Sequence, residues 1–169
     1  MFDKFRRNAR TIGVLAAAIT GIACMSAIAQ VIGEEAEMER LQNRAEEAIA
    51  NGDPDGAAMN MGKAALMASQ LAKKQEDQTK VQWYHGAEAL FRAQEQAYRA
   101  LALFQRAGGQ PPASSGVCST MRLAKEYLDK SLSLLVDASP ASARSQHFQN
   151  TASDWMKTLE GMNADFQCQ

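Results

Sequence analysis

Cysteine and histidine are the residue types in this chain that most often act in catalysis or metal binding, but their spacing matches none of the common reactive motifs. The sequence contains no Gly-rich phosphate loop, His-Glu-x-x-His motif, Cys-x-x-Cys pair or haem-attachment motif. His85 and His147 are far apart in the sequence, so we interpret each as a packed or surface residue rather than a catalytic base. Ser114 and Ser115 lie in a Gly/Pro-rich stretch that is typical of a linker. We therefore expect no catalytic residue and no cofactor.

Two of the three cysteines, Cys118 and Cys168, are positioned to form a disulfide. Cys118 precedes an expected helix that ends near Asp137, and Cys168 follows the next helix, which starts near Ser139 or Pro140. In an antiparallel hairpin the start of one helix lies beside the end of the next, so a bridge would close the open end of this hairpin. These are the two cysteines outside the expected leader, and an even number in an exported chain favours this pairing, with free or intermolecular thiols as the alternative.

Methionine is the one mildly unusual residue type, because thioethers can bind Cu(I) in an oxidising compartment. Met61, Met121 and Met162 fall on apolar helical stripes, where methionine fills gaps in a core. Met59 and Met61 are two residues apart and so do not share a helix face. Core packing is therefore our interpretation, and we expect no metal site.

Aromatic side chains at helical spacing form the richest apolar face of the chain, which extends to Phe104. This spacing favours core packing, with a ligand groove as the alternative if several rings prove exposed together. An excess of acidic residues near the start of the expected domain is typical of a solvated helix face, and a docking surface is the alternative. If these features do form an interaction surface, its candidate residues are Trp83, Tyr84, Phe91, Tyr98, Glu34 and Glu35.

The first thirty residues resemble an export leader. Four basic residues precede an uncharged stretch over residues 11–33, and Ala27-Ile28-Ala29 has the small-x-small form of a signal-peptidase site. We expect residues 1–29 to be a signal peptide, cleaved between Ala29 and Gln30, and the remainder to be periplasmic. An uncleaved inner-membrane anchor to about residue 33 is the alternative, and the positive-inside rule places the rest outside the cytoplasm in either case. A lipoprotein with Cys24 as the lipidated residue is a third reading.

Composition and charge limit the function of the rest. The leader holds four of the 18 basic residues and one of the 19 acidic residues, so the remaining 140 residues carry 14 basic and 18 acidic side chains. This net charge of −4 argues against nucleic-acid binding, which favours a basic stripe. The length is enough for one domain with a core.

Helical periodicity dominates residues 30–169 and predicts an all-α domain of five helices. Breaks are expected at residues 51–56, which are rich in Gly, Asp and Pro, at residues 108–116, which are rich in Gly, Pro and Ser, and at residues 137–140. The polar run at residues 73–78 is compatible with a turn capped by Asp77 or with one continuous helix. The loop at 108–116 would separate a three-helix part from a C-terminal hairpin.

Part of this pattern resembles the tetratricopeptide repeat. Small and large residues in the first segment fall close to the family's spacing, around a turn at Gly52-Asp53, at Leu41, Ala45, Ala48, Ala57, Met61 and Ala64. A second segment has Tyr84, Phe91, Ala100, Phe104, Ala107 and Pro112 in similar register, offset by 43 residues (Ala57 to Ala100) rather than the family's usual spacing of about 34. The resemblance implies an array of helical hairpins with a concave surface that binds a peptide or protein. A plain helical bundle is the alternative.

These observations lead to one functional expectation and two alternatives. We expect an exported, non-enzymatic interaction or accessory protein, in the form of a subunit of a membrane-associated assembly with an unidentified protein partner. The first alternative is a periplasmic carrier of a small ligand or metal in an inter-helix pocket. The second is a helical enzyme whose site assembles from distant residues.

Overall fold

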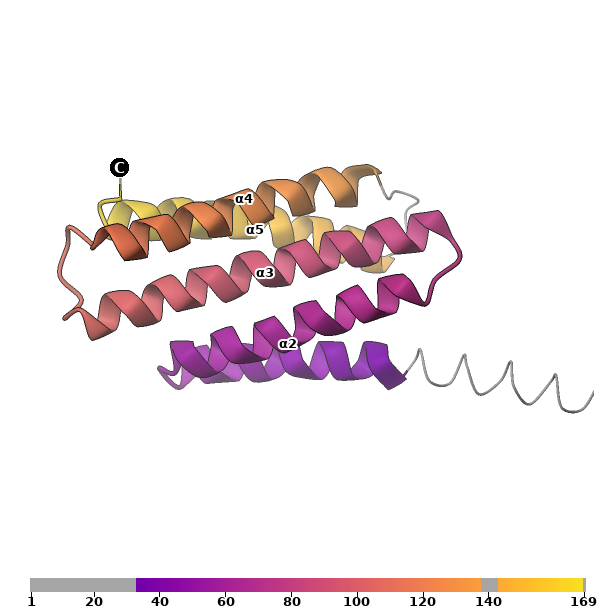
Figure 1. Cartoon of the computed structure of the whole chain (residues 1–169), viewed down its shortest axis with the longest axis horizontal. Coiled ribbons are helices and arrows are strands. Elements are labelled where there is room, and N and C mark those ends of the chain that lie inside the picture. The colour runs from indigo at the N-terminus through magenta and orange to yellow at the C-terminus, as the bar shows by residue number, and fades with distance from the viewer. Residues whose placement is uncertain (1–32, 138–142, 169) are drawn as a thin grey trace, which may run out of the picture. The chain divides into compact units, whose positions relative to one another are not determined.

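The computed structural model describes residues 33–137 and 143–168 as helices and their connections, with no strand in these ranges (Figure 1). The helices are residues 33–50, α2 (Pro54–Lys73), α3 (Gln78–Arg106), α4 (Ser115–Asp137) and α5 (Ala143–Asp165). The expected all-α class with five helices is confirmed. The expected signal peptide and its cleavage residues, Ala27, Ala29 and Gln30, lie outside the described residues. Among the helices that the structure describes, none combines the length and apolarity that a membrane span requires.

The chain divides into two compact units, Met1–Ala36 and Glu37–Gln169. Only residues 33–36 of the first unit are described, and they are helical. The second unit contains residues 37–50 of the first helix together with helices α2 to α5.

Two aspartates fix the starts of α2 and α3. Asp53 accepts a hydrogen bond from the backbone N–H of Gly56 at 2.8 Å, and Pro54 occupies the first turn, where its missing N–H costs nothing. Asp77 accepts a hydrogen bond from the backbone N–H of Thr79 at 2.9 Å. Within the polar run at residues 73–78, residues 74–77 therefore form a turn with Asp77 as the N-cap of α3, and the two helices are not continuous.

Helix α3 is the centre of a layer in which α2 and α4 lie on either side of it (Figure 1). It lies close to α4 at Gly86, where a methyl group in place of the hydrogen would lie 2.7 Å from Cδ2 of the buried Leu135. One turn away, the buried hydroxyl of Ser131 donates a hydrogen bond to the Gly86 carbonyl oxygen at 2.8 Å. A small residue and a satisfied polar contact thus set the α3–α4 distance.

Helix α5 covers the aromatic face of α3. Phe148 packs edge-on against both Trp83 and Phe91, with ring centroids 5.2 Å and 5.8 Å away. Further along the helices, Tyr98 meets Trp155 at 5.4 Å. Leu159, like Phe148, is buried, so the apolar stripe of α5 is a packing surface, as its helical spacing predicts.

A disulfide joins Cys118 and Cys168, whose Cα atoms are 5.3 Å apart. It ties the start of α4 to the segment that follows α5, and this is the expected pairing. Cys118 lies within the first turn of α4, not before the helix, because α4 already begins at Ser115. The same end is held by a hydrogen bond from the Ala113 N–H to the Phe166 carbonyl oxygen at 2.8 Å.

Candidate functional site

A charged triad on α3 is formed by Arg92, Glu95 and Arg99. The Glu95 carboxylate is only 4% exposed, and it accepts hydrogen bonds from Arg92 Nη1 at 2.8 Å and from Arg99 Nη2 at 2.5 Å. These residues are three and four positions from Glu95, so helical geometry brings all three side chains to one face. A carboxylate that is shielded from water needs charged hydrogen-bond partners. The Glu95 carboxylate in turn orients the guanidinium groups of Arg92 and Arg99.

The triad forms one side of a shallow groove between α2 and α3, with a volume of about 460 Å³. Its floor is at Gly62, where an added methyl group would lie 3.1 Å from the Glu95 carboxyl group. On α2, Met59 and Leu66 stand on either side of this floor, and they are 56% and 55% exposed. The groove therefore combines two exposed apolar side chains on one helix with two anchored arginines on the other.

Basic side chains outnumber acidic ones around this groove. Asp55 is held by Arg106, with Nη1 and Oδ2 2.7 Å apart, and Glu95 is shared by two arginines. The groove also includes Lys63, which has no ion pair with another described residue. Three basic and two acidic side chains thus line the groove, with Arg106 beside Asp55 at its edge, in a chain whose formal net charge is −1.

A smaller hollow of about 340 Å³ lies between α3 and α4. In it, His85 Nδ1 lies 3.3 Å from Glu88 Oε2, and Tyr127 and Lys130 face them from α4. Arg92 lines both this hollow and the α2/α3 groove. The two hollows therefore flank α3, with Arg92 between them.

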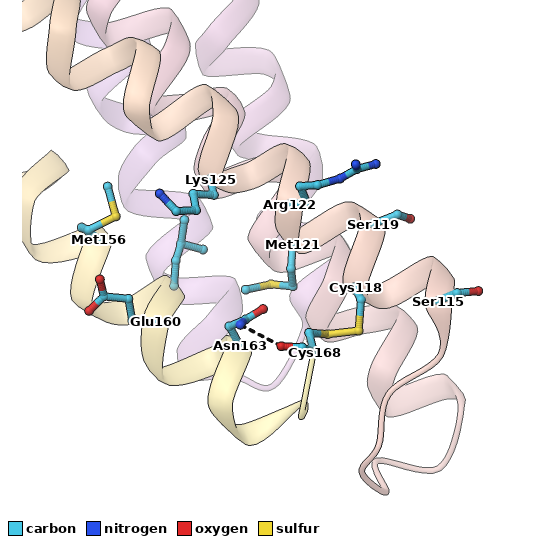
Figure 2. A pocket seen from close by; sticks show the side chains of 11 residues that line it. Ser115, Cys118, Ser119, Met121, Arg122, Lys125, Met156, Glu160, Asn163 and Cys168 are labelled. Atoms are coloured by element: carbon cyan, nitrogen blue, oxygen red, sulfur yellow. Dashed lines mark hydrogen bonds between the residues drawn. A yellow bond between two sulfur atoms is a disulfide. The ribbon is translucent and has the colours of Figure 1, made fainter.

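A third hollow, a pocket of about 630 Å³, lies between α4 and α5 beside the disulfide (Figure 2). Met121 and Leu159, both buried, contribute apolar surface, and both cysteines line the wall. Figure 2 shows Lys125 on α4 and Glu160 on α5, two charged side chains among those that line the pocket. Its lining combines apolar and sulfur-containing side chains with six polar or charged residues, a mixture that suits a small ligand with both apolar and polar groups.

The structure places the aromatic candidates for an interaction surface in the core. Trp83, Tyr84, Phe91 and Tyr98 are between 1% and 9% exposed. This corrects the idea that they form an open surface, because α5 packs over that face of α3. The helical spacing favoured the core alternative, which the structure confirms.

The other candidates are more dispersed. Glu34 and Glu35 are half-buried in the first unit of the chain, and their role in an interaction surface stays a prediction. His85 and His147 are both exposed, on α3 and α5. Within the described ranges, no group of three or more His, Cys, Asp and Glu side chains is arranged to hold a metal ion.

Sequence reasoning missed the triad and the groove. In the sequence, Glu95 lies within an apolar stretch of the expected helix. A charged residue in such a stretch indicates a buried ion pair, and this signal could have identified the triad. Met59 and Leu66 are seven positions apart and lie off the core stripe of α2, a pattern that indicates an exposed apolar row.

Searches against known protein families, characterised proteins and solved structures find no match to this chain.

Proposed function

We propose that this chain is an exported, non-enzymatic interaction protein that acts as a subunit of a membrane-associated assembly, with its helical domain in the periplasm. The observation that carries the proposal is the α2/α3 groove, where exposed Met59 and Leu66 lie opposite the anchored Arg92 and Arg99. The leader pattern of the sequence supports the location, either as a cleaved signal or as an inner-membrane anchor.

The composition of the groove is that of a protein interface rather than of a reactive site. Methionine and arginine are enriched at interfaces, where apolar contacts exclude water and arginine forms oriented hydrogen bonds. Tetratricopeptide-like spacing in the sequence supports the same proposal, because arrays of helical hairpins generally act as adaptors.

Site-specific photocrosslinking in the native cell envelope tests this function. A photoreactive residue placed at Met59 or Leu66 should give a discrete protein adduct. The same residue at Val136, which is 65% exposed on α4, is the matched control and should give none. Absence of groove-specific adducts would contradict the proposal.

A small-ligand carrier is the second candidate function, and the α4/α5 pocket favours it. If this function holds, native mass spectrometry of the protein purified without extraction by organic solvent should show a bound mass. The half-buried Met156 lines the pocket, so Met156→Trp should fill it and abolish the added mass. Retention of the bound mass in this variant would exclude the pocket as its site.

A further inference from the structure

We infer that the α2/α3 groove binds an acidic amphipathic helix of a partner protein. Apolar side chains of that helix would contact Met59 and Leu66, and its carboxylates would pair with Arg99, Arg92 and Lys63. The inference rests on the proposed function and names the chemistry of the partner.

The register of the two helices is the first argument. Helices α2 and α3 are joined by a short turn and run antiparallel, with Gly62 opposite Glu95. Met59 precedes Gly62 by three residues, and Arg99 follows Glu95 by four, so both lie toward the same end of the groove. By the same reasoning Leu66 and Arg92 lie toward the other end. Each exposed apolar side chain therefore has an arginine across the groove.

Spacing along the groove is the second argument. Met59 and Leu66 are seven residues apart, as are Arg92 and Arg99, which corresponds to about 10.5 Å along each helix. In a bound helix, side chains at positions i and i+7 also lie on one face, two turns apart. It can therefore place one apolar and one acidic residue against each end of the groove.

Charge is the third argument. Each guanidinium group has five N–H donors, and only one contact to Glu95 is made by each of Arg92 and Arg99. Glu95 thus orients the arginines and leaves donors for a second carboxylate, so little side-chain freedom is lost on binding. With Lys63 added, the groove has an excess of positive charge that an acidic ligand complements.

A second copy of this chain fits the groove less well. The acidic helix at residues 37–50 would be its natural contribution, but the apolar side chains of that helix, Met38, Leu41 and Ala45, are already buried. An anionic membrane would meet the basic groups without using the hollow at Gly62. A separate acidic amphipathic helix uses the apolar row, the hollow and the basic excess together.

Fluorescence anisotropy with the full chain tests the inference. The probe is a labelled, designed helical peptide of about 18 residues, long enough to form helix on binding, with two leucines seven positions apart and glutamates beside them. A peptide with lysine for every glutamate is the first control, and phosphatidylglycerol vesicles are the second. We expect binding of the acidic peptide alone, weakened at high salt.

Matched variants locate the binding site. Lys63→Glu and Leu66→Asp should each weaken binding by about tenfold or more, as expected when one charge pair or one apolar anchor is lost. Arg122→Glu and Val136→Asp change exposed residues of α4 in the same way and should leave binding unchanged. Circular dichroism establishes that all four variants keep the helical fold.

Several results would overturn the inference. These are equal binding of the acidic and basic peptides, binding to vesicles alone, or a groove-dependent dimer in sedimentation without peptide binding. Photocrosslinks from Leu66 together with a failed acidic-peptide assay would refute the acidic helix and leave the interaction function standing. Loss of the crosslinks themselves would instead refute the proposed function.

Discussion

At the scale of single residues, Tyr98 shows how the core changes the chemistry of a side chain. Burial, and then the negative charge of nearby Glu46, raise the pKa of Tyr98 from 10.0 to about 12. Between these values the unfolded chain loses the phenol proton while the folded protein keeps it. The contribution of the protonated Tyr98 to the stability of the folded protein is therefore complete below about pH 10 and is lost as the pH rises toward 12.

This linkage predicts a pH-dependent effect that Tyr98→Phe removes. Raising the pH from 8 to 11 should lower the free energy of unfolding by about 1.4 kcal/mol through Tyr98. This is the energy of one pKa unit, because pH 11 lies one unit above the pKa of Tyr98 in the unfolded chain and about one unit below its pKa in the folded protein. Urea unfolding of the parent and of Tyr98→Phe at both pH values measures it. Identical pH dependence in the parent and in Tyr98→Phe would refute the assignment.

At the scale of helices, the approach of α3 to α4 depends on the missing side chain of Gly86. A methyl group there would lie 2.7 Å from Cδ2 and 2.8 Å from Cγ of Leu135, which is fully buried, so the packing around Leu135 would have to shift. Gly86→Ala should therefore destabilise the protein by about 1–3 kcal/mol, the usual cost of overpacking, despite the better helix propensity of alanine. Urea unfolding gives this difference directly.

Gly161 on α5 provides the matched control for this substitution. It is also helical, but an added methyl group would have no atom within 4 Å. Gly161→Ala should therefore stabilise the protein by up to about 1 kcal/mol through helix propensity alone. If both alanine variants changed stability in the same direction, close helix packing would not be the role of Gly86.

The helices themselves could be predicted from sequence, whereas the groove could not. Residue types and periodicity mark helix positions, and Asp53-Pro54 marks a helix start by local chemistry alone. The polar run before Gln78 stayed ambiguous, because only the observed cap at Asp77 selects a turn. The groove depends on the register of α2 against α3, which places Gly62 opposite Glu95. This register follows from the packing of whole helices, so it cannot be predicted from local patterns in a single sequence.

At the scale of the whole molecule, the disulfide constrains the C-terminal hairpin. Cys118 and Cys168 are 50 residues apart, and in the loop-entropy model closing such a loop stabilises the folded state by about 4 kcal/mol. The Cys118→Ser/Cys168→Ser variant should lose a stability of this order in urea unfolding. Reductant should destabilise the parent equally and leave the variant unchanged. A parent that is insensitive to reductant would show that the bridge contributes little.

The fate of the leader determines where the molecule and its groove are found. The sequence predicts cleavage after Ala29, so native protein should be soluble, begin at Gln30 and be two hydrogen atoms lighter than its reduced form because of the Cys118–Cys168 bridge. Intact mass spectrometry of soluble and membrane fractions, prepared without reductant, measures both properties at once. A full-length membrane species would refute cleavage and identify the leader as an anchor. The groove would then act within reach of the membrane surface, and its partner should be sought in a membrane complex rather than among free periplasmic proteins.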